Sequence, residues 1–358
     1  MEGRRILTFL RPDVLADAYY EDNTLTELSL IPRGKESLLG NIYVGRVKNI
    51  AKNIRAAFVE VEGGMICYLP LEDVQEPVWA CMKKGEQLAE GDLLLVQVSR
   101  EAVKSKAPSV TTNLNLSGKY LVLTTGNRRM GYSSRFSAEE KERLKALTGQ
   151  WAEDDAGWIV RTNAAKACSE ELEMEHRRLL SQYEYLRTRA VHRLACSCVW
   201  KSRPPYLDTI LGSRENILQE ILTDDTDLYA QIRQFMEEEM PEDLEKLRLY
   251  EDRMLPLKAM YRLEKGLEEA LKEKVWLKSG AYLVIEPTEA LTVIDVNTGK
   301  FTGGKQKEDT IQKINREAAQ EIARQLRLRN LSGIILVDFI DMALPEDRQE
   351  LLEEMRRL

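Results

Sequence analysis

Two short apolar runs near the C-terminal end, separated by one amphipathic segment of helical length, constrain the fold of this chain more than any other feature. The runs at 291–294 and 334–337 have the length of buried strands, and each is followed at once by an aspartate, Asp295 or Asp338. The segment at 309–329 repeats apolar residues at helical spacing. A strand, a helix and a strand in this order predict a βαβ unit with parallel strands.

The ends of that helix carry local signals. Asp309 and Gln312 predict a variant of the capping box at its start, and Asn330 and Gly333 are typical of its end. Before the first strand, the sequence E-P-T-E at 286–289 predicts the turn of a hairpin. The residues expected on the buried face of the helix are Ile311, Ile314, Ala318, Ile322 and Leu326.

The βαβ geometry implies a site. Because parallel strands end at the same edge of a sheet, Asp295 and Asp338 are expected within reach of one cation. Buried carboxylates that face each other are costly unless a cation or a proton lies between them. Oxygen ligands favour Mg²⁺, with Mn²⁺ as an alternative, and Asn297 on the same side is placed to hold a metal-bound water. The competing interpretation is that each aspartate only caps the helix or turn that follows.

The N-terminal third predicts a small β barrel of the oligonucleotide-binding type. A glycine in the middle of a strand, Gly45, is a common mark of a barrel bend, and E-G-G at 62–64 predicts a hairpin. In one strand Ala57, Val59 and Val61 form the apolar face, so Phe58 is expected to point the other way. The expected strands are 40–50, 55–61, 65–70 and 91–100.

The middle of the chain mixes strands and helices. Ser137 and Glu140 predict a capping box at the start of a helix, and the strand at 157–162 ends on Arg161 and Thr162. A long charged helix is expected from 170 to about 200, and helical periodicity continues in the acidic segment after it.

Charge is unevenly distributed. Residues 100–135 contain seven basic residues and one acid, whereas residues 215–252 contain thirteen acids and three bases. Phosphate binding depends on local basic surface and not on the net charge of −7, so the basic segment is a candidate phosphate contact. A solvated face explains it about equally well.

Composition excludes several classes of protein. A chain of 358 residues is long enough for two to four compact units, each with a hydrophobic core that is stable without disulfides. Its five cysteines lack zinc-finger spacing, which favours reduced thiols in a cytoplasmic protein. No membrane span or signal peptide is expected. The chain has only two histidines, His176 and His192, so few residues are available for histidine-based catalysis. Metal-assisted phosphodiester hydrolysis needs no histidine.

Two longer stretches carry a resemblance to a known family. They are T-E-A-L-T-V-I-D-V-N-T-G at 288–299 and N-R-E-A-A-Q-E-I-A-R-Q-L-R-L-R-N-L-S-G-I-I-L-V-D-F-I-D-M at 315–342. The chain resembles bacterial ribonuclease E/G endoribonucleases, and it is more similar to the compact ribonuclease G type than to the long ribonuclease E type. A weaker resemblance covers the rest of the chain from Gly40 onward. It implies Mg²⁺-dependent cleavage of single-stranded RNA, with 5′-phosphate products and stimulation by a 5′-monophosphate end, in rRNA maturation or mRNA decay.

The resemblance also implies roles for individual residues. Asp295 and Asp338 match the family's magnesium ligands, and Asn297 matches the asparagine that assists them. Phe58 and Tyr68 match aromatics that stack on bases, with tyrosine in place of the usual phenylalanine, although a packing contact is the competing interpretation. The residues that match other contacts are Lys106 for RNA guidance, and Gly118, Val122, Arg135, Arg161 and Thr162 for the 5′-phosphate. Taken alone, Arg161 would be assigned to a surface salt bridge.

The implied architecture is a multi-domain α/β chain. A ribonuclease H-like fold would contain an inserted S1 barrel and a 5′-sensor, and a DNase I-like catalytic subdomain would follow. The expected boundaries are 1–36 and 208–271 for the two ribonuclease H-like parts, 37–113 for the barrel, 114–207 for the sensor and 272–358 for the catalytic subdomain.

The sequence departs from the family pattern at its C-terminal end. The zinc-link motif is absent and the sequence stops within an expected helix, so no structural Zn²⁺ is expected and a homodimer would lack the zinc-linked contact. Two rival functions follow: an RNA-binding protein without catalysis, and a DNA nuclease that uses the same metal pair. The loop at 299–305, rich in glycine and lysine, is interpreted either as a phosphate contact or as an ordinary surface loop.

Overall fold

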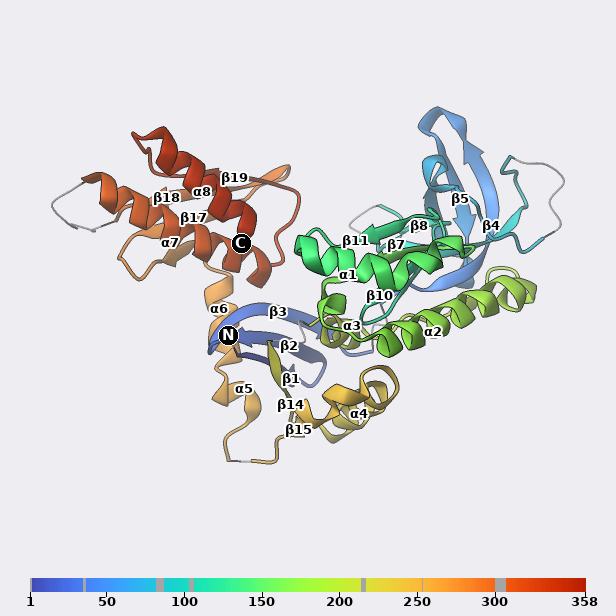
Figure 1. The fold of residues 1–358 in the computed structure, drawn as a ribbon, viewed down its shortest axis with the longest axis horizontal. Helices are drawn as coiled ribbons and strands as arrows, with labels where there is room; N and C mark the ends of the chain where they lie inside the picture. The colour runs from blue at the N-terminus through green and yellow to red at the C-terminus, as the bar shows by residue number, and fades with distance from the viewer. Residues whose placement is uncertain are drawn as a thin grey trace. The chain divides into compact units, whose positions relative to one another are not determined.

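The computed structural model describes the chain except residues 1, 35–36, 82–86, 103–105, 214–216, 253 and 300–306. The chain divides into two units that alternate along the sequence. The first contains Met1–Gly34, Asn216–Arg233 and Asp243–Leu358, and the second contains Lys35–Glu215 and Gln234–Glu242. The first unit holds two separate sheets, and the second holds a barrel and a further sheet, which confirms the mixed α/β class (Figure 1).

The C-terminal sheet of the first unit contains the predicted βαβ unit. Strand β18 pairs in parallel with β19, and helix α7 connects them. Strands β17 and β18 form the predicted hairpin around residues 288–290. The sheet order is β16-β17-β18-β19. The elements are β16 (Lys274–Trp276), β17 (Tyr282–Pro287), β18 (Leu291–Asn297), α7 (Lys307–Leu328), β19 (Ile334–Asp338) and α8 (Pro345–Arg357).

Helix α7 begins earlier than the sequence predicts. Its first residue is Lys307, so Asp309 lies inside the first turn and the predicted capping box is wrong. An acid inside the first turn still stabilises the positive end of the helix dipole. The aspartate that predicts the helix start therefore lies within one turn of the first helical residue. The predicted end is confirmed, because Asn330 and Gly333 both adopt positive φ just beyond Leu328.

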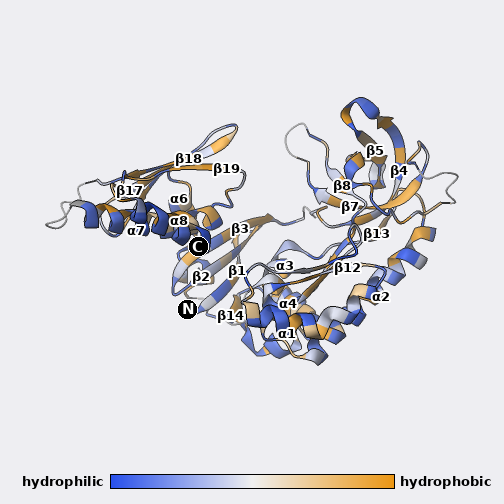
Figure 2. Ribbon diagram, turned by 45° about the horizontal axis from the view of Figure 1, so that its top comes forward, coloured by the Kyte–Doolittle hydropathy of each residue, from blue (hydrophilic) through white to orange (hydrophobic). Residues whose placement is uncertain are grey.

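In the part of the chain that the structure describes, helices cover only one face of this sheet. Ile314, Ala318 and Ile322 of α7 are buried against Leu283 and Ile294 of the sheet. Figure 2 shows α7 and α8 along the same side of β17, β18 and β19. The prediction that both apolar runs are buried strands is therefore wrong for β19, whose Ile334 and Leu336 are 68% and 57% exposed.

The N-terminal sheet of the first unit combines strands from the start of the chain with two later strands. Its order is β15-β14-β1-β2-β3: β1, β2 and β3 form an antiparallel meander, β14 is parallel to β1, and β15 is parallel to β14. Arg324 of α7 donates to the carbonyl of Leu25, so helix α7 contacts this sheet. The elements are β1 (Gly3–Arg11), β2 (Val14–Glu21), β3 (Thr24–Pro32), β14 (Leu218–Thr223), α4 (Thr226–Glu239), β15 (Leu247–Leu249), α5 (Leu257–Met260) and α6 (Leu263–Ala270).

The second unit contains the predicted barrel. Five strands close in the order β4-β5-β6-β8-β7, with β7 pairing back to β4. Gly45 faces the interior, where an added Cβ would lie 2.5 Å from Val59 and 2.8 Å from Val96. The strands are β4 (Ile42–Ala51), β5 (Ala56–Glu60), β6 (Ile66–Pro70), β7 (Leu93–Arg100) and β8 (Ser109–Thr111).

A second sheet packs against the barrel and shares its core. Its order is β11-β12-β10-β9, and Trp158 and Leu121 of this sheet are buried in one cluster with Val44 of the barrel. The capping box of α1 is confirmed, since the Ser137 hydroxyl and the Glu140 carboxylate each accept from the other residue's N–H. The elements are β9 (Asn115–Ser117), β10 (Leu121–Thr124), β11 (Met130–Tyr132), α1 (Ala138–Thr148), β12 (Gly157–Val160), α2 (Ser169–Thr188), β13 (Cys198–Trp200) and α3 (Pro205–Gly212).

The long charged helix is shorter than predicted. It ends at Thr188, and residues 198–200 form β13, which pairs with β4 of the barrel. The acidic segment likewise contains strands β14 and β15 beside helix α4. Periodicity alone does not separate a short strand from a continued helix, because three residues carry too little pattern. Among the described residues, no helix has both the length and the apolar character of a membrane span.

Candidate functional site

Asp295 and Asp338 lie directly opposite each other on neighbouring parallel strands. The register of β18 and β19 pairs their Cα atoms at the C-terminal end of both strands, and strands in one sheet are about 4.8 Å apart. The alternate residues Ile294 and Val296 point into the core, so the aspartates point to the uncovered face. The prediction that one sheet edge brings the two carboxylates together is confirmed.

Both carboxylates are exposed to solvent. The expectation that the aspartates are buried is therefore wrong, because helices cover only the other face of the sheet. Within the described part of the chain, Asp338 has no hydrogen bond or ion pair with protein, so it does not cap a helix or turn. Its oxygens are open to a ligand.

Asn297 fixes one of these carboxylates. Its Nδ2 donates a hydrogen bond of 2.5 Å to Oδ2 of Asp295, which confirms that the two side chains share one side of β18. The amide therefore restrains the Asp295 carboxylate. The donor set at this edge consists of oxygens, which suits Mg²⁺ or Mn²⁺. Across the described residues, no group of three histidine, cysteine or acidic side chains is arranged to hold a metal.

The loop after Asn297 requires a glycine at its second position. Gly299 has a φ of +60°, and a Cβ there would lie 2.4 Å from the carbonyl oxygen of Gly280. The backbone of the site therefore approaches the loop before β17 too closely for any side chain. The glycine- and lysine-rich remainder, 300–305, for which the sequence favours either a phosphate contact or a surface loop, lies outside the described residues.

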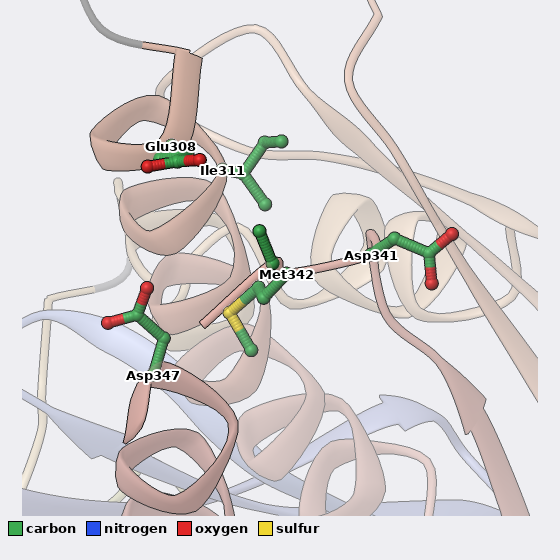
Figure 3. Close-up of a pocket in the computed structure, with 6 residues that line it drawn as sticks. Glu308, Ile311, Asp341, Met342 and Asp347 are labelled. Carbon is green, nitrogen blue, oxygen red and sulfur yellow. The ribbon is translucent and has the colours of Figure 1, made fainter. Parts of the chain in front are cut away.

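A small acidic pocket lies beyond the end of β19. It is lined by residues of α7, of the loop after β19 and of α8, and its volume is about 160 Å³. Figure 3 shows the carboxylates of Glu308 and Asp347 on one side of Met342, and that of Asp341 directed away on the other. Asp347 accepts a hydrogen bond of 2.8 Å from Gln312, so one of these acids already has a protein partner. The pocket does not include Asp295 or Asp338.

The two barrel aromatics form a pair on the outer surface. Phe58 and Tyr68 are opposite each other on β5 and β6, and their ring centroids are 6.3 Å apart at an interplanar angle of 73°. Ala57 and Val59 are fully buried while Phe58 is half-buried, which confirms the predicted outward orientation. Lys106 is exposed in the same unit. The structure thus brings the two aromatics together.

The residues predicted to bind a 5′-phosphate lie on or beside the sheet β11-β12-β10-β9. Arg161 donates a hydrogen bond of 2.5 Å to the carbonyl of Gly118. The hydroxyls of Thr162 and Ser133 are 3.0 Å apart, and the N–H of Arg135 donates to the same Ser133 oxygen at 3.3 Å. Val122 belongs to β10, the central strand that pairs with β12. The structure therefore links these residues in two small groups.

Arg161 forms no surface salt bridge with any residue that the structure describes. Burial lowers the pKa of its guanidinium, and the nearby carboxylates of Glu175 and Asp208 oppose that shift. The interpretation of this arginine as an ordinary surface partner is therefore wrong. A half-buried guanidinium retains donors for an anion such as a phosphate.

Glu175 was missed by the reasoning from sequence. Its carboxylate is buried and accepts hydrogen bonds of 2.9, 2.9 and 2.7 Å from the backbone N–H groups of Lys119, Tyr120 and Leu121. Burial raises the pKa of Glu175, and these donors oppose the shift. The available signal was its position on the apolar face of α2 between Leu172 and Leu179, both of which are buried.

Glu175 also explains why position 118 is a glycine. A Cβ on Gly118 would lie 2.2 Å from a carboxylate oxygen of Glu175. The backbone N–H groups of the next three residues, which could otherwise bind an anion, already have this partner. The side chain of Lys119 is likewise buried and donates to Glu242 at 2.5 Å. The expectation that the whole basic segment faces phosphate is thus wrong for Lys119.

Comparison with known proteins gives consistent matches. The family model described as the ribonuclease E/G family matches residues 115–358. The chain is 33% identical over 378 residues to ribonuclease G of Salmonella typhimurium (strain SL1344), covering 98% of this chain and 74% of that protein. It is 34% identical to ribonuclease G of Haemophilus influenzae, with coverages of 99% and 74%. Ribonuclease E of Nostoc sp. is 34% identical over 354 residues, covering 95% of this chain and 50% of that protein.

Proposed function

Because this chain belongs to the ribonuclease E/G family and is an endoribonuclease, we propose that it cleaves single-stranded RNA with Mg²⁺ held by Asp295 and Asp338. The observation that carries the proposal is the register of β18 and β19, which sets two exposed carboxylates side by side. The oxygen-only donor set supports Mg²⁺, with Mn²⁺ as a substitute.

The chain's own residues have distinct tasks at this site. Bound Mg²⁺ would supply Lewis-acid stabilisation of the charge that develops on the phosphoryl oxygens. Asn297 holds the Asp295 carboxylate in one orientation through its 2.5 Å hydrogen bond, and its carbonyl oxygen remains available to orient a water. Hydrolysis would leave a 5′-phosphate and a 3′-hydroxyl.

The barrel would bind the RNA strand. The outward-facing pair Phe58 and Tyr68 offers ring faces, and base–aromatic stacking contributes about 1–3 kcal/mol per base. Stacking tolerates any base, since every base has a π-face. Lys106, which is exposed, would contact the phosphate backbone and direct the strand.

Arg161 and its neighbours would recognise a 5′-monophosphate end. Arg161 offers a guanidinium fork and Thr162 a hydroxyl, a combination that suits a phosphate monoester. Arg135 is exposed and joins this group through Ser133. Gly118 would contribute indirectly, because it makes room for the Glu175 carboxylate and positions Arg161 through its carbonyl.

We also propose family assignments for the sheets. The order β15-β14-β1-β2-β3, with an antiparallel meander followed by two parallel strands, supports a ribonuclease H-like fold for 1–36 and 208–271. The sheet of β16–β19 would be the DNase I-like catalytic subdomain, 272–358. The closed barrel would be the S1 domain, 37–113, and the sheet beside it the 5′-sensor, 114–207.

A cleavage assay tests the proposed activity. A single-stranded RNA oligonucleotide with a 5′-monophosphate should be cut in the presence of Mg²⁺, and EDTA should abolish cutting because the carboxylates alone supply no Lewis acid. Added excess Mg²⁺ should restore it. The products should carry 5′-phosphates, as measured by end-group analysis.

Two results of this assay would contradict the proposal. RNA affinity that ignores Mg²⁺, with no products formed, would indicate an RNA-binding protein without catalysis. Equal cutting of a DNA oligonucleotide in a competition experiment would indicate a nuclease without preference for RNA.

Replacing Arg161 with alanine should remove the preference for a 5′-monophosphate. Charge-assisted hydrogen bonds contribute about 1.5–3 kcal/mol, so the preference over a 5′-hydroxyl substrate should fall roughly 10- to 100-fold. The measurement is kcat/KM on matched 5′-monophosphate and 5′-hydroxyl RNAs, with cleavage of the 5′-hydroxyl RNA as the internal control. A folded variant, verified by its melting temperature, that retains the full preference would exclude Arg161 from the sensor.

A further inference from the structure

An aromatic pair lies on the same uncovered sheet face as the aspartates. Trp276 of β16 is 62% exposed, and its ring centroid is 5.2 Å from that of the half-buried Tyr282 on β17. The alternate residues Val275 and Leu283 pack into the core on the other side. The core of this sheet is therefore complete without Trp276, whose large apolar surface remains in water.

The register fixes where this pair sits relative to the candidate metal site. Trp276 is opposite Tyr282, and Tyr282 is opposite Asn297, so the three form one row across the sheet. In the next row, Lys274 is opposite Val284, which is opposite Asp295. Strand spacing of about 4.8 Å places Trp276 two strands, or roughly 10 Å, from Asn297.

A cation completes the group. The Nζ atom of Lys274 lies 3.4 Å from the ring centroid of Tyr282 and 4.3 Å from that of Trp276. In the described part of the chain Lys274 has no carboxylate partner, and it is exposed. An exposed contact between a lysine and an aromatic ring is weaker than the stacking of a base on that ring, so the ammonium can move to a phosphate when a base arrives.

We propose that Trp276, Tyr282 and Lys274 form a nucleobase subsite beside the catalytic aspartates. The base of a nucleotide next to the scissile phosphate stacks on Trp276, Tyr282 supports the indole ring, and Lys274 binds a neighbouring phosphate. Rings that stack bases next to a lysine are the chemistry of single-strand binding, and the occupant is RNA because the chain is an endoribonuclease. The subsite rests on the proposed function in one respect: the statement that the stacked base lies next to the cleaved bond requires that the aspartates form the catalytic site.

The test measures stacking without cleavage. The variant Asp338→Asn holds RNA uncut, and oligonucleotides carry 2-aminopurine at successive positions around the cleavage point. One position should lose its fluorescence on binding, and the double variant Asp338→Asn/Trp276→Ala should restore that fluorescence. RNA affinity should fall about 5- to 150-fold, which corresponds to about 1–3 kcal/mol.

Matched variants separate the ring from general effects. Trp276→Phe keeps an aromatic face and should retain most of the quenching, whereas Leu271→Ala removes an exposed apolar side chain of the same unit and should change nothing. Lys274→Gln should reduce the slope of log affinity against log salt by about one. In the otherwise wild-type enzyme, Trp276→Ala should raise KM far more than it lowers kcat.

Two outcomes overturn the subsite. Quenching that is unchanged by Trp276→Ala at every position shows that no base stacks there. Self-association of the protein that is lost in Trp276→Ala, without any effect on RNA, shows that a second copy of the chain covers the ring. The failure of the proposed metal site looks different: the protein would not cut RNA in Mg²⁺, yet the position-specific quenching and its loss would persist.

Discussion

Replacing Asp338 with asparagine is expected to lower the rate of RNA cleavage roughly a thousandfold or more at saturating Mg²⁺. The amide keeps the shape of the side chain but removes the negative charge, and a metal ion contributes several kcal/mol to the stabilisation of the transition state. Asp295→Asn should have an effect of the same size, since the two carboxylates are paired in register and would hold the same ion under the proposed mechanism. The measurement is the single-turnover rate on a 5′-monophosphorylated RNA.

Binding and stability separate this effect from general damage. Both aspartates are exposed, so the asparagine variants should melt within a few degrees of the wild type. RNA affinity should be unchanged or slightly higher, because one negative charge near the phosphates is gone. Glu289→Gln, an exposed acid in the turn at the other end of the β17–β18 hairpin, is the matched control and should cleave normally. Wild-type rates in both aspartate variants would refute the metal site.

The second large effect concerns stability. Glu175→Ala should destabilise the second unit by about 3–5 kcal/mol, because three buried backbone N–H groups lose their acceptor and each orphaned donor costs about 1–3 kcal/mol. This corresponds to a fall in melting temperature of roughly 6–20 °C. Tryptophan fluorescence follows this unit selectively, since it contains Trp79, Trp151, Trp158 and Trp200, and only Trp276 lies in the other unit.

Two further variants test the cause. Glu175→Gln retains one carbonyl oxygen and should fall between the wild type and Glu175→Ala. Glu173→Ala removes a half-buried acid of the same helix, which pairs with Arg177 and accepts a hydrogen bond from Ser169, and it should change stability by less than about 1 kcal/mol. If Glu175→Ala melted like Glu173→Ala, the carboxylate would not be the support of the loop at 118–121.

The candidate metal site could be predicted from sequence because every step in it is local or topological. The apolar runs at 291–294 and 334–337 identify strands, the periodicity of α7 identifies a helix, and a strand–helix–strand order makes the strands parallel. Parallel neighbours end at one edge, so the meeting of Asp295 and Asp338 follows without knowledge of any distant contact. The outward direction of Phe58 follows equally from alternation along one strand.

Other features needed the tertiary structure. Glu175 accepts hydrogen bonds from a loop that lies 54 to 56 residues away in sequence. No local pattern in α2 or in that loop predicts this contact. The partners of Arg161 and Lys119 also lie far along the chain, since Glu175 and Asp208 are near Arg161 and Glu242 accepts from Lys119. The exposure of β19 depends on which face of the sheet the helices cover. Packing across the whole unit determines that face.

By itself, then, the sequence determined the type and order of the elements in the βαβ unit and of most barrel strands, because short-range periodicity and chain connectivity govern them. It also determined that two carboxylates share one sheet edge. The tertiary structure alone decided which polar groups are buried, which donors are already taken, and that Trp276, Tyr282 and Lys274 lie on the open face beside those carboxylates. The physical reason is that burial and partnership arise from contacts between distant segments, whose energies no local pattern encodes.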